Sequence, residues 1–159
     1  MISVNYNQNE PYILMADDDE DDALFMIAAF KAVGLIGATK RVNNGVELIV
    51  FLKDIISHNL ILPALIILDL NMPQKNGKDV LKIIKSNNGL KQIPIIIYST
   101  SDTKSDILES YKLGCNGYIV KPSNYSEIEV IAGKIKKFFI DTTSNTAENL
   151  SEKTFTLDL

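Results

Sequence analysis

Cysteine and histidine, which build many active sites, occur only once each in this sequence of 159 residues. Cys115 cannot form an internal disulfide, and a lone thiol is typical of a chain that works in the reducing cytoplasm. His58 alone cannot supply a histidine-based metal site or a Ser/His/Asp triad. A long apolar run is also missing, because the stretch 60–68 is broken by Pro63 and ended by Asp69, so we expect no membrane span.

Basic residues are in the minority, with 16 Lys and Arg against 20 Asp and Glu and a net charge of −4. Contacts to nucleic-acid phosphates require a basic surface, so we expect no nucleic-acid partner. Residues 1–10 have neither the positive charges nor the apolar segment of a signal peptide. Composition and length therefore favour one globular, cytoplasmic domain.

Apolar stretches alternate with helical patterns five times in the chain. We expect short strands at residues 12–16, 39–42, 64–69, 94–98 and 117–120. Each is followed, after a short connection, by a segment of helical periodicity. Repeated strand–helix units predict a parallel sheet covered by helices on both faces, and hence one α/β domain over residues 11–140.

The segments outside this domain are polar. Residues 1–10 are predicted to be a flexible lead-in, and residues 141–159 to be a disordered polar tail. An additional strand at the end of the tail is the alternative, because Phe155, Leu157 and Leu159 alternate with polar residues.

Periodicity and capping patterns also predict how three of the helices lie. The first helix is expected to share one face among Leu24, Ile27, Ala28 and Lys31, and the third to turn Val80, Ile83 and Ile84 inward. Thr103 and Ser126 have the spacing of N-terminal caps for the last two helices.

Polar side chains follow four of the expected strands, namely Asp17 and Asp18, Asp69, Ser99, and Lys121. Parallel strands bring their carboxyl ends to one edge of the sheet, so these groups should converge. Three carboxylates together repel one another, and either their pKa values rise or a cation lies among them. Mg²⁺ prefers such oxygen ligands, and a hydroxyl with an ammonium suits the oxygens of a transferring phosphoryl group. The inferred chemistry is phosphoryl transfer to Asp69, giving an acyl phosphate.

Six consecutive acids, residues 17–22, admit other interpretations. A solvated acidic turn is one. A calcium-binding EF-hand is another, but Asp22 stands where that loop needs glycine and Ala28 where it needs glutamate. We interpret residues 19–22 mainly as charges that favour a helix N-terminus.

Four motifs together carry a family resemblance, ILMADDDEDDALFM, LIILDLNMPQKNG, IIIYSTSD and LGCNGYIVKP. In these, the chain resembles the receiver domains of two-component response regulators, a family that includes the chemotaxis regulator. It is most similar to stand-alone receivers associated with phytochrome-type histidine kinases. The resemblance implies a three-layer, flavodoxin-like (βα)5 fold with strand order 2-1-3-4-5.

The resemblance also implies roles for the acidic residues. Asp69 would be the phosphoacceptor. Asp17 and Asp18 would hold Mg²⁺ together with Asp69 and the backbone carbonyl of Asn71.

Further roles follow for the last two strands. Lys121 would pair with the phosphate, and its bond to Pro122 is expected to be cis. Ser99 stands in place of the usual threonine and would also contact the phosphate. Tyr118 matches the aromatic switch residue that moves inward when that hydroxyl engages phosphate.

The predicted function is that of a single-domain response regulator, not an enzyme beyond its own phosphorylation and hydrolysis. Its partner would be a histidine kinase, of the phytochrome type, or a phosphotransfer protein. The signal would alter the face formed by helix 4, strand 5 and helix 5, which could also form a homodimer.

Two other functions are weighed beside it. A degenerate receiver acting only as an interaction module should lack an acid or the lysine, and none is missing. A Mg²⁺-dependent phosphohydrolase would carry its nucleophile at the first strand end, but the residues that follow Asp17 do not fit that family.

Overall fold

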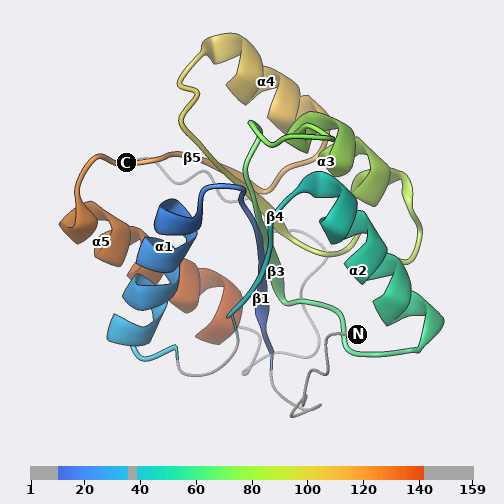
Figure 1. Ribbon diagram of the computed structural model, residues 1–159, viewed down its shortest axis with the longest axis horizontal. Coiled ribbons are helices and arrows are strands. Elements are labelled where there is room, and N and C mark those ends of the chain that lie inside the picture. The colour runs from blue at the N-terminus through green and yellow to red at the C-terminus, as the bar shows by residue number, and fades with distance from the viewer. Residues whose placement is uncertain (1–10, 36–38, 142–159) are drawn as a thin grey trace.

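The computed structural model describes residues 11–35 and 39–141 (Figure 1). The predictions of a flexible lead-in at 1–10 and a disordered tail lie outside the described residues, apart from residue 141. Among the described residues, no helix is both long enough and apolar enough to cross a membrane.

Five parallel strands form the central sheet in the order β2-β1-β3-β4-β5, as predicted. The strands are β1 (Ile13–Ala16), β2 (Thr39–Val42), β3 (Leu65–Leu68), β4 (Ile95–Ser99) and β5 (Gly117–Val120). The order puts β3 in the middle and reverses the direction of winding between β1 and β3. In open sheets such a reversal opens a crevice at the carboxyl ends of the two strands.

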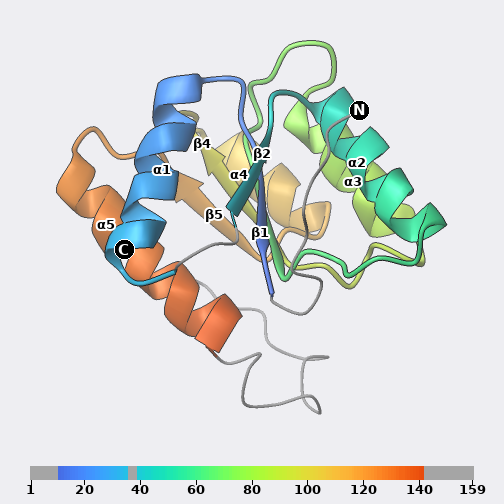
Figure 2. The ribbon, with the colours of Figure 1, turned by 60° about the horizontal axis from the view of Figure 1, so that its bottom comes forward.

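Helices cover both faces of the sheet, which gives the predicted three layers (Figures 1 and 2). The helices are α1 (Glu20–Ala32), α2 (Gly45–Ser57), α3 (Gly77–Ser86), α4 (Lys104–Lys112) and α5 (Tyr125–Ile135), followed by the π-helical turn η1 (Lys136–Asp141). α1 packs beside α5 on one face, while α2 and α3 lie on the other.

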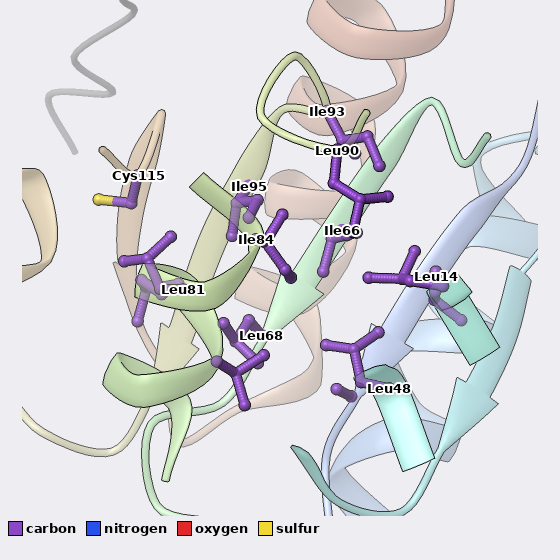
Figure 3. Packing of buried hydrophobic residues seen from close by; sticks show 14 of the residues in the cluster. Leu14, Leu48, Ile66, Leu68, Leu81, Ile84, Leu90, Ile93, Ile95 and Cys115 are labelled. Atoms are coloured by element: carbon purple, nitrogen blue, oxygen red, sulfur yellow. The ribbon is translucent and has the colours of Figure 1, made fainter. Parts of the chain in front are cut away.

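Alternation along the strands builds a separate core on each face. In β1, Leu14 points to the α2–α3 face and Met15 to the α1–α5 face, and Ile66 and Ile67 of β3 divide in the same way. Figure 3 shows the first of these cores, where the labelled side chains of β1, β3 and β4 meet those of α2 and α3. A strand buried on both faces has no polar positions, which explains the continuous apolar run of β3.

Side-chain caps start all five helices. In each case a side-chain oxygen accepts the backbone N–H three residues on, and the capping residues are Asp19, Asn44, Asn76, Thr103 and Asn124. The prediction for Thr103 is confirmed. The prediction for Ser126 is wrong, because Asn124 caps α5 two residues earlier.

Two predicted helix faces need correction. Leu24 is 53% exposed, and α1 instead buries Ala23, Met26, Ala29 and Phe30. In α3, Ile83 is 38% exposed and Leu81 takes the inward position between Val80 and Ile84. Both helices carry apolar residues beyond the buried stripe, so the sequence pattern alone did not fix the rotation of the helix.

Candidate functional site

The predicted site residues meet at the carboxyl edge of the sheet. Backbone bonds extend the strand ladders to them: the Asp69 N–H donates to the Ala16 carbonyl at 3.0 Å, and the Lys121 N–H donates to the Ser99 carbonyl at 2.8 Å. Asp17 follows β1 directly, so the carboxyl ends of β1, β3, β4 and β5 all lie at the same edge of the sheet. The backbone therefore fixes the positions of these side chains before any of them interact.

The Lys121 ammonium lies at the centre of the site and is nearly buried. Its Nζ donates to Oδ2 of Asp69 at 2.9 Å and to Oδ2 of Asp22 at 2.9 Å, and it lies 2.8 Å from Oδ2 of Asp17. Burial disfavours the charged form, but the three carboxylates outweigh it and raise the pKa of Lys121. The ammonium is therefore charged and fixed beside Asp69.

Asp17 is fully buried, and its environment is costly for a carboxylate. Its Oδ1 accepts the Asp19 N–H at 3.0 Å. The contact of Oδ2 with Lys121 has the distance of an ion pair but not the direction of a hydrogen bond, and no other donor in the described part of the chain reaches that oxygen. Burial raises the pKa of Asp17 to about 6; Lys121 opposes the shift and Asp69 adds to it.

These acids fit a divalent cation. Asp17, Asp18 and Asp69 each offer a carboxylate oxygen, and the three oxygens lie within 4.8 Å of one another. Hard oxygen donors of this kind suit Mg²⁺ and similar ions, and the buried Asp17 oxygen without a hydrogen bond is the group that an ion would satisfy. The Asn71 N–H donates to Oδ1 of Asp69 at 3.1 Å, so this loop wraps the acid, while the role of the Asn71 carbonyl stays a prediction.

Arg41 of β2 supports the acidic loop from the side. Its guanidinium donates to the carbonyls of Asp17 and Asp18 at 3.2 and 3.3 Å. Arg41 was not among the site residues predicted from the sequence, although a basic residue on the strand beside β1 is a signal for it. Arg41 holds the backbone of the loop and leaves both carboxylates free to face the site.

Ser99 and Tyr118 are linked through the loop after β4. Ser99 is fully buried, and its Oγ accepts from the Asn71 side-chain amide at 3.4 Å and from the Ser101 N–H at 3.3 Å. The Tyr118 hydroxyl donates to the Ser101 carbonyl at 2.8 Å, with its ring packed in the α2–α3 core. Ser101 thus contacts both residues that the sequence assigned to a switch.

A sequence model of the response regulator receiver domain matches residues 13–132. The chain belongs to this family. The match covers β1 to α5, so it includes every strand end of the site.

Two similar proteins are named response regulators. Response regulator Rcp1 from Synechocystis is 31% identical over 83% of this chain and 90% of that protein. A crystal structure of its Mn²⁺-bound form superposes with a TM-score of 0.74, at 31% identity and covering 83% of this chain and 96% of that one. The phosphorylated cyanobacterial phytochrome response regulator RcpA superposes with a TM-score of 0.77, at 34% identity and 84% and 96% coverage.

An ion-pair cluster next to Ser101 joins α3 to α4. Lys78 pairs with Asp106 at 2.7 Å and with Glu109, and Asp106 also accepts the Ser101 hydroxyl. Bonds from Lys78 and then Ser101 lower the pKa of Asp106 to about 2. The sequence pattern gave no signal for this link, because Lys78 and Asp106 lie on different helices.

One expectation for the receiver is overturned, and another is incomplete. The Lys121–Pro122 bond is trans, since no cis peptide bond occurs in the described residues. The long lysine side chain reaches Asp69 from the trans backbone, and trans is the more stable isomer before proline. Asp22 is a charge in the first turn of α1, as interpreted from the sequence, and it also binds Lys121 directly. It lies one turn before Met26 on the buried side of α1, which is the signal that could have revealed it.

Proposed function

We propose that this receiver accepts a phosphoryl group on Asp69 from the phosphohistidine of a histidine kinase, in a Mg²⁺-dependent reaction. The observation that carries the proposal is the pairing of Asp69 with the Lys121 ammonium at 2.9 Å, next to a cluster of two further acids. A lysine with a purely structural role would need only one carboxylate partner. Lys121 has three, and burial destabilises the charged form of one of them, Asp17.

The transfer balances with the groups present. A carboxylate oxygen of Asp69 attacks phosphorus and forms the O–P bond, while the P–N bond of the phosphohistidine breaks and its electron pair leaves with the imidazole. Lys121 balances the negative charge of the phosphoryl oxygens, and positioning with charge balance is most of what such a transfer requires. Mg²⁺ held by Asp17, Asp18, Asp69 and the Asn71 carbonyl would neutralise the remaining charge.

Ser99 and Tyr118 are proposed to report the reaction. The Ser99 hydroxyl faces the site from the end of β4 and would donate to a phosphoryl oxygen. Ser99 Oγ accepts its bonds from Asn71 and Ser101, so its hydrogen stays available for the phosphoryl oxygen, and a movement of Ser99 toward that oxygen would draw the Ser101 N–H with it. Because Tyr118 is held by the Ser101 carbonyl, a shift of this loop changes the balance between positions of the ring.

The signal would leave through the surface of α4, β5 and α5. Four large apolar or aromatic side chains are exposed on these elements, namely Leu108, Val120, Tyr125 and Val130. A surface cleft of about 510 Å³ lies beside Val120 and Val130 and includes Lys121 in its lining. A partner protein or a second copy of the chain, giving a homodimer, is proposed to bind on this surface.

The phosphoryl donor is proposed to be a histidine kinase of the phytochrome type, or a phosphotransfer protein. Support comes from the named relatives, of which RcpA is a phytochrome response regulator and RtBRR, at 29% identity, a bacteriophytochrome response regulator. Location in the cytoplasm and the lack of a nucleic-acid partner stay predictions.

Intact mass spectrometry after incubation with Mg²⁺ and acetyl phosphate tests the proposal. Here the P–O bond of the donor breaks and acetate leaves. We expect a gain of one phosphoryl group in the parent and none in Asp69→Asn. No gain in the parent with acetyl phosphate, together with no binding of beryllofluoride, contradicts the proposal and favours an interaction module.

A further inference from the structure

We propose that Asp22 is a positioning residue for phosphoryl transfer, holding the Lys121 ammonium in place while the other two carboxylates change partners. The inference rests on the proposed function. It assigns a role to a residue that the sequence alone placed among helix-end charges.

The contacts of Lys121 separate Asp22 from the other two acids. Nζ is within 2.9 Å of all three carboxylates, but only Asp17 and Asp69 belong to the cluster that can hold a metal ion. Asp22 lies outside that cluster and comes from α1, whereas the other two acids follow strands. Among residues 11–35 and 39–141, the Asp22 carboxylate pairs with the lysine alone.

Phosphorylation changes the charge of Asp69, and a bound cation would become a second partner of Asp17. Forming the acyl phosphate converts the Asp69 carboxylate to an uncharged carbonyl with a phosphoryl substituent, so the ammonium must move its bond to a phosphoryl oxygen. A cation bound to Asp17 would share the Asp17 carboxylate with Lys121, and this would weaken the attraction between Asp17 and the ammonium. Asp22 keeps its charge and position throughout, and is the one partner in this set that can hold the ammonium during the change.

The backbone around Asp22 makes it a firm anchor. Its N–H donates to the capping oxygen of Asp19 at 3.0 Å, and Ala23, the next residue, is fully buried against the sheet. The Asp22 side chain is 38% exposed, so it could have turned to water, yet it faces Lys121. A charged hydrogen bond from a fixed helix restricts the flexible lysine side chain to the reactive geometry.

Asp21 provides a matched control on the same turn of α1. It is exposed and carries the same charge, and it takes no part in the pairing of Lys121. Asp22→Asn and Asp21→Asn therefore remove equal charge near the site, but only the first takes a charged partner from the lysine. A difference between them reports positioning rather than net charge.

The experiment measures the rate of phosphoryl gain by the full chain at saturating acetyl phosphate, followed over hours by intact mass. We expect Asp22→Asn to lower the maximal rate about tenfold relative to Asp21→Asn, a change of about 1.4 kcal/mol in the barrier. Mg²⁺ affinity should agree within about twofold between the two variants, because neither residue is a proposed ligand. In a Lys121→Met background, adding Asp22→Asn should leave the rate unchanged.

Equal rates in Asp22→Asn and Asp21→Asn overturn the inference, and so does a full tenfold loss that persists in the Lys121→Met background. A faster rate in Asp22→Asn also overturns it, since Asp22 would then compete with the phosphoryl group for the lysine. In each of these cases the parent still gains a phosphoryl group, whereas failure of the proposed function is recognised by the absence of any gain in the parent.

Discussion

Burial of Asp17 should make the metal-free receiver more stable at pH 5 than at pH 7. The native pKa of Asp17 is about 6, above the ordinary value of 3.8, so the native state binds more protons than the unfolded state between these values. Stability therefore rises as the pH falls through this window and is lost as the pH rises through about 6. Asp106, which pairs with Lys78, has a pKa of about 2, so it stays charged between pH 7 and pH 5. Its effect on stability begins only when the pH falls below about 4.

The size of the effect follows from linkage. For one group with a native pKa of about 6 and an unfolded pKa of 3.8, the gain between pH 7 and pH 5 is about 1.3 kcal/mol. The limit at lower pH, reached when Asp17 is protonated in both states, is about 3 kcal/mol. Urea unfolding in EDTA at the two pH values measures this difference, with the slope expected to stay constant.

Asp17→Asn is the control, because the amide does not titrate between pH 5 and pH 7. The variant should lose the gain on acidification and be more stable than the parent at pH 7 without metal. Mg²⁺ at ten times its dissociation constant should stabilise the parent at pH 7 by about 1.4 kcal/mol and reduce its pH dependence. Equal pH dependence in the parent and Asp17→Asn would refute the assignment of this cost to Asp17.

Three further changes test the surrounding structure. Gly77→Ala should destabilise the fold by about 2 kcal/mol and slow phosphorylation, because a Cβ there would collide with the backbone of Asp69; unfolding and mass measurements check both effects. Lys85→Met should cost about 2 kcal/mol in urea unfolding, since its ammonium donates to the carbonyls that end the α3–β4 connection, whereas the exposed Lys82→Met should cost little. Ser99→Ala should lower the rate of phosphoryl gain from acetyl phosphate several-fold, whereas Ser99→Thr keeps the hydroxyl and should react about as fast as the parent. Equal rates in the parent, Ser99→Ala and Ser99→Thr would contradict the proposed phosphate contact.

Much of the site could be predicted from the sequence because it is made of strand ends. Once the stretches ending at Asp69 and Lys121 are recognised as parallel strands, the topology alone brings them to one edge. The distance of 2.9 Å between them adds detail to a juxtaposition that the sequence already implies. The same reasoning does not extend to residues on helices, whose direction depends on how each helix is rotated against the sheet.

That rotation explains what was missed. In α1 the apolar residues extend around the helix, and the choice between Leu24 and Met26 as inward depends on packing against α5. With the wrong face chosen, Asp22 was interpreted mainly as a charge at the helix N-terminus. Asp106 was missed for a related reason, because its partner Lys78 is on another helix and the contact depends on the spacing of α3 and α4.

The two edge strands have a consequence for how receivers of this kind can associate. β2 is four residues long and carries Lys40 and Arg41, while β5 is equally short and runs directly into Lys121 and Pro122. Short edges with charges, and a proline that lacks an N–H, are poor templates for adding a foreign strand. The sheet is thus protected against growth into a larger sheet, and a partner that binds beside β5 must do so through side chains.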